Sequence, residues 1–140
     1  MVDPHNGIIT FENPAITIRP DMTRLEFLEA SWAHNASDSV VNEPWHSWDL
    51  AGEYRSRMIS FLVVLYFHGD RLNMVNLCNG DRAFGTSWSE YSLEKEALRE
   101  ASHNRWLSEC IGNKRSFDWG IVWSGIDQRG GGASIVIRYS

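Results

Sequence analysis

The chain has 140 residues, a typical length for one domain and enough to bury a single hydrophobic core. Hydrophobic residues make up 43% of the sequence and charged residues 22%, and seven tryptophans, six phenylalanines and four tyrosines exclude a mainly disordered chain. The longest apolar run, Met58–Phe67, is about half of the roughly 20 residues that a membrane-spanning helix requires. The N-terminus has neither the basic nor the apolar segment of a signal peptide, so we expect no membrane partner and no secretion.

The charge of the chain is unevenly distributed. The formal net charge is −5, which argues against a nucleic-acid partner. Between Arg24 and Arg55 there are six acidic residues and no lysine or arginine, and the rest of the chain is close to neutral. This acidic segment is either a solvated face that keeps the protein soluble or a surface for a basic partner.

The two cysteines, Cys78 and Cys110, have 31 residues between them and belong to no paired Cys-x-x-Cys motif. A disulfide scaffold needs a denser set of cysteines, and a structural zinc site usually needs paired spacing. We therefore expect two reduced, buried thiols, a cytoplasmic location, and neither a metal nor another cofactor.

In chain order, the first predicted element is a β-hairpin, because residues 7–11 and 16–19 are short β-branched runs joined by a turn-forming Glu-Asn-Pro-Ala sequence. Thr23 and Glu26 have the spacing of a capping box, and apolar residues follow at helical intervals. A short amphipathic helix is therefore predicted from Thr23 to about His34. Residues 35–52 have no hydrophobic period and are predicted to form a loop, with a short helical turn after Pro44 as the alternative.

Two strands are predicted in the middle of the chain. Residues 57–67 form a dense apolar run whose length suits a strand buried on both faces. A hairpin turn at residues 68–71 leads to a second strand at residues 72–77. A further turn at residues 79–81 precedes a weaker strand over residues 83–88.

A second helix is predicted over about residues 92–111. Ser92 is a good N-cap, acidic residues occupy the first turn, and Gly112 lies where a C-cap glycine is expected. At 100° per residue, one face of this helix carries Leu93, Ala97, Ala101, Leu107 and Ile111, and this face is predicted to be buried.

The C-terminus contains the clearest strand pair. Large apolar residues alternate with other residues over 117–124, which predicts one large apolar face made by Phe117, Trp119, Ile121 and Trp123. Residues 127–132 form a turn, and Ile135, Ile137 and Tyr139 then alternate back. The element order predicts an α+β fold in a single domain over residues 1–140. Its mainly antiparallel sheet has an N-terminal hairpin, central strands and a C-terminal hairpin, with two helices packed on one face.

Two short motifs invite a chemical interpretation. Glu43-x-x-His46-x-x-Asp49 contains residue types that bind metals or act as a general base, but the spacing matches no known ligand signature, so solvated residues are the better interpretation. Gly130-Gly131-Gly132 is followed by no helix and no Lys-Ser/Thr pair, which favours a hairpin turn over a phosphate-binding loop. We assign no catalytic and no metal-binding residue.

Tryptophans give a further indication. Trp106, Trp119 and Trp123 lie on or beside predicted core faces, whereas Trp45 and Trp48 fall in the irregular acidic segment. Aromatic residues in loops are favoured anchors of protein interfaces. A loop folded over the core would need such residues too, so both interpretations stay open.

The C-terminal sequence Trp119-Gly120-Ile121-Val122-Trp123-Ser124-Gly125-Ile126-Asp127, followed by Ser134-Ile135-Val136-Ile137-Arg138-Tyr139, is similar to the end of small bacterial proteins. The N-terminal runs at residues 7–11 and 16–18, with Thr23 and residues 26–28, are similar to theirs as well. These proteins resemble the single-domain immunity proteins of bacterial toxin systems, which bind and neutralise a cognate toxin. The shared motifs are structural, so no family binding residues can be transferred.

The sequence therefore predicts a cytoplasmic protein that works by binding another protein. The resemblance implies an immunity protein, and the acidic segment predicts a basic partner such as a toxin. One alternative is a small-molecule-binding or enzymatic domain with a pocket near the 35–52 loop, and a second is an acidic secretion chaperone. The residues assigned to the partner surface are Asp38, Glu43, Trp45, His46, Trp48 and Asp49.

Overall fold

A computed structural model describes residues 1–33 and 36–140 of the chain. The strands are β1 (Ile9–Glu12), β2 (Ala15–Ile18), β3 (Ser37–Asn42), β4 (Trp45–Asp49), β5 (Tyr54–Ser56), β6 (Ile59–His68), β7 (Arg71–Asn79), β8 (Ser116–Phe117), β9 (Gly120–Ile126) and β10 (Ala133–Tyr139). The helices are α1 (Arg24–Glu29) and α2 (Leu93–Ile111), with short 3₁₀ turns at Ser31–Ala33, Arg82–Phe84 and Trp88–Glu90.

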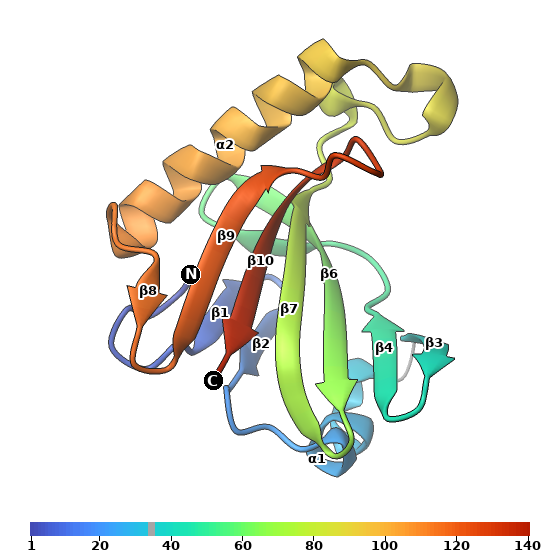
Figure 1. Cartoon of the computed structure of the whole chain (residues 1–140), viewed down its shortest axis with the longest axis vertical. Helices are drawn as coiled ribbons and strands as arrows, with labels where there is room; N and C mark the ends of the chain where they lie inside the picture. Colours follow the sequence, from blue (N-terminus) through green and yellow to red (C-terminus); the bar gives the residue numbers. More distant parts are fainter. Residues whose placement is uncertain (34–35) are drawn as a thin grey trace.

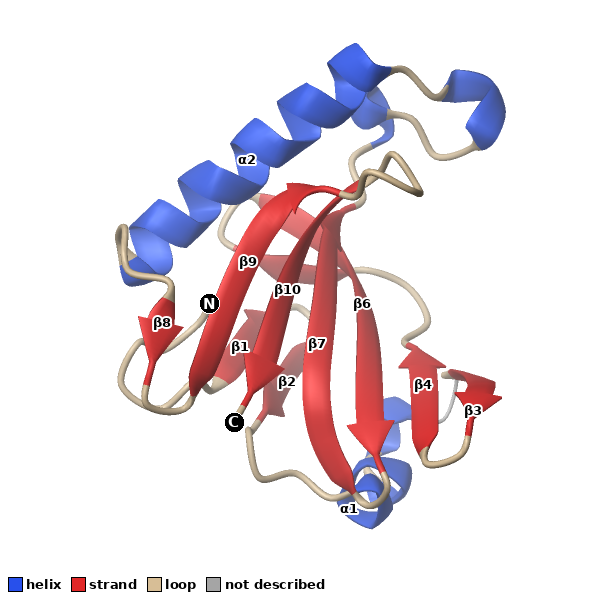
Figure 2. Cartoon of the chain, in the orientation of Figure 1, coloured by secondary structure: helices blue, strands red, loops and turns tan. Residues whose placement is uncertain are grey.

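Antiparallel pairing joins the strands into two sheets. Among the described residues, β1 and β2 form a separate hairpin, and the other eight strands form one sheet in the order β3-β4-β6-β7-β10-β9-β8, with β5 also paired to β6. Figures 1 and 2 show this sheet with β6, β7, β10 and β9 side by side and the β3–β4 hairpin at one edge. The predicted α+β class with a mainly antiparallel sheet is confirmed.

The helices and the β1–β2 hairpin pack on the same face of the large sheet, which we call the inner face. The ring of Phe27 on α1 lies 5.6 Å from that of Phe67 on β6. Phe61, also on β6, meets Phe11 of β1 at 6.3 Å and Trp106 of α2 at 4.8 Å. These fully or nearly fully buried aromatic residues form the centre of the core, and the expected packing of both helices on one face is confirmed.

Local signals at the N-terminus behave as predicted, except for the length of the first helix. The β1–β2 hairpin is present, and Thr23 and Glu26 form the capping box that begins α1. The helix ends at Glu29 because Ala30 has an extended backbone, and a 3₁₀ turn follows. The predicted end at His34 lies outside the described residues.

Helix α2 has the predicted limits, with Ser92 as its N-cap and Gly112 as its C-cap, but the predicted buried face is wrong in its first half. Leu93, Ala97 and Ala101 are exposed, whereas Glu96 and His103 are buried. The polar atoms of these two buried residues bond to backbone N–H groups of other segments, at Ala133 and Asn79. The facing of the helix therefore follows these bonds as well as apolar burial.

The prediction that residues 117–124 form one continuous strand is also wrong. The chain turns at residues 118–119, between β8 and β9, and this turn shifts the alternation of the side chains. In β9 it is Val122 that faces the core, opposite the buried Ile137 of β10, and Ile121 and Trp123 that face solvent. The predicted inward facing of β10 is confirmed, and the register with β10 decides the facing of β9.

Two further differences concern the centre of the chain. Strand β6 buries only alternate side chains, from Phe61 to Phe67, while Leu62 between them is 47% exposed. The predicted strand over residues 83–88 is absent, because the Asp81 side chain accepts the Ala83 N–H and begins a 3₁₀ turn. The β6–β7 hairpin is present as predicted.

Candidate functional site

The segment that was predicted to be a loop, residues 35–52, contains the β3–β4 hairpin. Neither a structureless loop nor a helical turn after Pro44 is correct. Strand β3 lies at the edge of the sheet and pairs only with β4 among the described strands, which removes the need for a regular apolar alternation. Residue 35 lies outside the described residues.

The hairpin divides the predicted site residues between the two faces of the sheet. Trp48 points to the inner face, where its ring lies 5.5 Å from that of Phe27, and Asp38 stands opposite Trp48 in the β3–β4 register. Trp45 and Asp49 project to the other side, because successive strand residues alternate. Trp48 is therefore mainly a packing residue, whereas Trp45 is 38% exposed.

The acidic and histidine residues of the same hairpin lie near its turn and its end. His46 Nε2 lies 3.1 Å from the Glu43 carboxylate, which is itself well exposed. Asp49 is at the end of β4 and is not brought to this pair. Among the residues described by the structure, no group of three or more His, Cys, Asp or Glu side chains is placed to hold a metal ion.

The face of the large sheet opposite to α1, α2 and the β1–β2 hairpin, which we call the outer face, is the other candidate surface. In Figure 1 it is turned towards the viewer. Ile121 is 57% exposed and Trp123 is 45% exposed, and both project from β9 onto this face. Apolar or aromatic side chains that also project outward are Trp45, Leu62, Val64, Tyr66, Met74 and Val136.

A groove of about 770 Å³ crosses the outer face over β7, β10 and β9. In the strand register, Val136 stands between Asn76 and Trp123, so these three side chains form one row across the groove. A Cβ atom added at Gly125 would lie 2.6 Å from the Trp123 ring, which shows that the indole covers the position where a side chain would otherwise stand. Arg138 and the β9–β10 turn, with Asp127 and Arg129, complete the lining.

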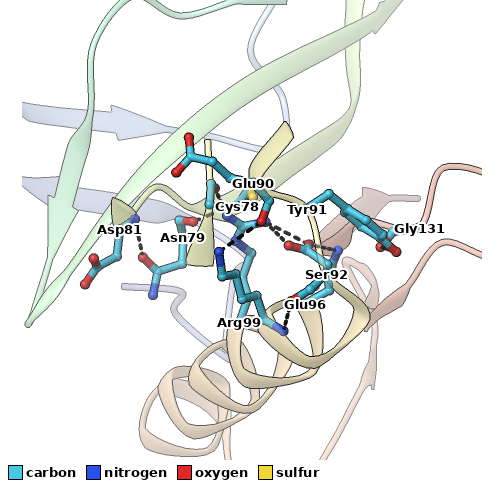
Figure 3. A network of polar contacts seen from close by, with 12 residues as sticks. Cys78, Asn79, Asp81, Glu90, Tyr91, Ser92, Glu96, Arg99 and Gly131 are labelled. Atoms are coloured by element: carbon cyan, nitrogen blue, oxygen red, sulfur yellow. Dashed lines mark hydrogen bonds and ion pairs between the residues drawn. The ribbon is translucent and has the colours of Figure 1, made fainter. Parts of the chain in front are cut away.

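A buried polar network holds the β9–β10 turn against α2, as Figure 3 shows. The Glu96 carboxylate is almost fully buried and accepts bonds from the Ala133 N–H at 2.9 Å and from Arg99 Nη1 at 2.5 and 2.7 Å. Arg99 Nη2 donates to the Gly85 carbonyl at 2.6 Å, and Tyr91 Oη donates to the Gly131 carbonyl at 3.0 Å. The network therefore fastens residues 85–91 and the turn at 127–132 to one helix.

A second cavity, of about 360 Å³, lies beside this network and is lined by residues that include Leu62, Cys78, Trp88 and Tyr91. Burial raises the pKa of the Cys78 thiol, so the thiol stays protonated and is a poor nucleophile. No residue of the segment 36–52 lines either of these two cavities. Glu53, which follows the segment, lines two further cavities of about 560 and 280 Å³.

His103 is fully buried on α2. Its Nε2 accepts the Asn79 N–H at 2.8 Å, so the neutral ring carries its proton on Nδ1, which has no hydrogen-bond partner among the described residues. Burial, together with the nearby Arg99 guanidinium, lowers the pKa of His103 to about 4. The ring is therefore a neutral structural acceptor at neutral pH.

Sequence reasoning missed the outer face because it placed Ile121 and Trp123 in the core. The β9–β10 register is the signal that could have found it. The inward residues of β10 were predicted correctly, and their partners on β9 are Ser124, Val122 and Gly120. The residues between these partners, Ile121 and Trp123, must then face outward. No family model, curated protein or solved structure matches the chain. No helix in the described part of the chain is long and apolar enough to cross a membrane.

Proposed function

We propose that this chain is a protein-binding domain of the toxin-immunity kind, and that it binds its partner through the outer face of the sheet. The observation that carries the proposal is the exposure of Ile121 and Trp123 side by side with other apolar residues on that face. Exposed apolar patches on a folded domain mark interaction sites, and tryptophan is the residue type most enriched among interface hot spots.

The acidic segment supports a basic partner. Asp38, Glu43 and Asp49 are all exposed on the β3–β4 hairpin, at the edge of the same sheet. Asp49 and Trp45 project to the outer face, so the acidic residues of the hairpin border the apolar residues of that face. Carboxylates in this position would accelerate encounter with a positively charged protein, while the apolar residues would slow its dissociation.

The first step of the test is to find the partner. The product of the gene next to this one is expressed and purified, and its binding is measured by biolayer interferometry; in parallel, it is tested for toxicity with and without this chain. A toxin that this chain binds and neutralises is the expected result. A neighbouring product that is neither bound nor neutralised contradicts the immunity assignment.

The second step locates the surface. Trp123→Ala is expected to weaken binding at least about 30-fold, the size of a 2 kcal/mol hot spot. Trp88→Ala is the matched control, because Trp88 is 78% exposed on a 3₁₀ turn outside the groove. Equal effects of the two substitutions would contradict the assignment of the contact to the outer face.

A further inference from the structure

The groove on the outer face has an arginine at each end. Arg138 is opposite Ile121 in the register, and Arg129 belongs to the β9–β10 turn that closes the other end of the groove. Within the described residues, neither guanidinium takes part in an ion pair, whereas Arg19, Arg57 and Arg99 do. The Arg138 side chain donates a hydrogen bond from Nη2 to the Met74 sulfur at 4.0 Å.

The other charges of the groove neutralise these arginines only in part. Asp127 is a carboxylate in the lining, and its Oδ1 accepts the backbone N–H of Arg129 at 3.0 Å. The remaining lining residues are neutral, so the groove carries two positive charges against one negative charge. This sign is opposite to that of the chain as a whole, whose net charge is −5.

The centre of the groove carries the apolar side chains of Trp123 and Val136 beside the polar Asn76 and Ser134. The length of the groove can be obtained from the strand geometry. From Ile121, in the row of Arg138, to Asp127 there are six steps from one residue to the next along β9 and its turn, which at about 3.4 Å per residue gives roughly 20 Å. The indole of Trp123 lies over Gly125 between the two ends. An extended segment of about six residues has the same length.

We infer that this groove binds an extended acidic segment of the partner, with a carboxylate near each end and an apolar side chain on Trp123. The inference rests on the proposed function for the identity of the occupant as a protein, and it adds the chemistry of the segment. The partner then presents charges of both signs: a basic patch faces the β3–β4 hairpin, and an acidic segment faces Arg129 and Arg138. Carboxylates suit arginine because the guanidinium binds them through two parallel hydrogen bonds.

The polar network of Figure 3 gives the groove a fixed end. The turn that carries Arg129 is bonded on its far side through the Gly131 carbonyl to Tyr91 and through the Ala133 N–H to Glu96. A Cβ atom at residue 131 would lie 2.5 Å from Tyr91 Oη, and the glycine has a φ of +75°. The turn is thus held close to α2, and a preformed end costs less entropy on binding.

The experiment uses two capped hexapeptides as probes. One has glutamate at its first and last positions and leucine in the middle, and the other has lysine in place of both glutamates. Each is titrated into the ¹⁵N-labelled full chain, with the Trp123 indole signal assigned from a Trp123→Phe variant. We expect the glutamate peptide to shift the Trp123 indole and the amides of residues 121–129 and 134–138, and to bind at least tenfold more tightly than the lysine peptide.

Substitution of the two arginines tests the charge requirement. Arg129→Gln together with Arg138→Gln should lower the affinity for the glutamate peptide at least fivefold. This loss of affinity should be smaller at about 0.5 M salt, where charges are screened. Arg105→Gln is the matched control, because Arg105 is exposed on α2 and lies outside the groove. Thermal melts verify that the variants are folded. Equal binding of the two peptides, shifts outside the groove, or equal effects of the groove and control substitutions would each overturn the inference.

The two proposals can fail separately. If the peptides do not bind the groove but Trp123→Ala still abolishes partner binding, the outer face is the contact surface, and the inference that the groove binds an acidic segment of the partner is wrong. If the glutamate peptide binds as expected but the partner is unaffected by Trp123→Ala, the groove recognises acidic segments and the proposed partner contact is wrong.

Discussion

Two isoleucines on adjacent strands of the C-terminal hairpin illustrate how the side of the sheet decides the role of a residue. Ile137 on β10 is fully buried against the core, and Ile121 on β9 is 57% exposed on the outer face. They belong to the same antiparallel pair of strands, in adjacent rows of the register. Their chemistry is identical, so a difference in the effect of substitution reports burial alone.

The first prediction compares these two positions. Ile137→Ala should lower the free energy of unfolding by about 2–5 kcal/mol, because it removes buried methyl groups and leaves a cavity. Ile121→Ala should cost less than about 1 kcal/mol. Urea denaturation of both variants measures the two values. Comparable losses at the two sites would show that β9 does not have the facing described above.

The second prediction concerns the buried His103. Its pKa is about 4 in the folded protein, below the value of 6.5 for an unperturbed histidine, so between pH 6.5 and 4 the unfolded chain binds the additional proton. The contribution of His103 to the free energy of unfolding is therefore complete above pH 6.5. It is lost as the pH falls towards 4, with a slope that approaches about 1.4 kcal/mol per pH unit. Urea midpoints measured between pH 7 and 4 provide the test.

Two variants isolate the contribution of this ring. His103→Gln keeps an acceptor for the Asn79 N–H but does not titrate, so its stability should vary less with pH in this window. His68→Gln makes the same substitution at an exposed histidine at the end of β6, away from Asn79, and is the control. If His103→Gln shows the same slope of stability against pH as the wild type, a group other than His103 causes the pH dependence.

At the level of secondary-structure elements, α2 connects segments that are distant in sequence. Its buried Glu96–Arg99 pair bonds to Ala133 on β10 and to the Gly85 carbonyl before the second 3₁₀ turn of the 82–90 region. Both side chains are largely shielded from water, so removal of one leaves the other charge buried without its partner. The pair therefore links α2 to β10 and to the segment around Gly85, and its loss should make the β9–β10 turn more mobile.

The third prediction follows from this burial. Glu96→Gln and Arg99→Met should each destabilise the protein by about 3–5 kcal/mol, and the double variant should cost clearly less than the sum of the two, because no unpaired charge remains. Hydrogen exchange should show the largest loss of protection at residues 126–133. The exposed Arg57–Glu109 pair, at 3.3 Å, is the control and should contribute no more than about 1 kcal/mol. Additive effects at residues 96 and 99 would contradict the coupling.

For the molecule as a whole, the important property is the distribution of charge. Six acidic residues lie between Arg24 and Arg55, and those on the β3–β4 hairpin are exposed at one edge of the sheet. The opposite part of the outer face carries Arg129 and Arg138. The protein therefore presents regions of opposite charge, and association with a partner should depend on ionic strength.

The fourth prediction tests the acidic edge. Neutralising Asp38, Glu43 and Asp49 together, as Asn, Gln and Asn, should slow association with the partner at low salt and have little effect at about 0.5 M salt, where screening extends only a few ångströms. The dissociation rate should change little, and thermal stability should be nearly unchanged because the three side chains are exposed. An unchanged association rate and salt dependence would mean that these carboxylates serve solubility alone.

The amino-acid sequence by itself determined the features that depend on a few neighbouring residues. The capping box of Thr23, the caps of α2 at Ser92 and Gly112, and the hairpins around residues 13–14, 69–70 and 127–132 were all predicted correctly. Caps, turn residues and β-branched runs act over one helical turn or less, so their effect can be inferred without knowledge of the fold. The α+β class follows from the order of these elements.

Only the tertiary structure decided which side of each element is buried, and with it the candidate surface. Val122 faces inward because it stands opposite Ile137, and Trp123 therefore faces outward to line the groove. Glu96 and His103 are buried because backbone N–H groups from β10 and β7 reach them across the fold. Strand β3 forms because β4 pairs with β6 and extends the sheet to it. The physical reason is common to all three: register and facing are set by partners far away in the chain, and a pattern of period two or 3.6 is compatible with either side until that partner is in place.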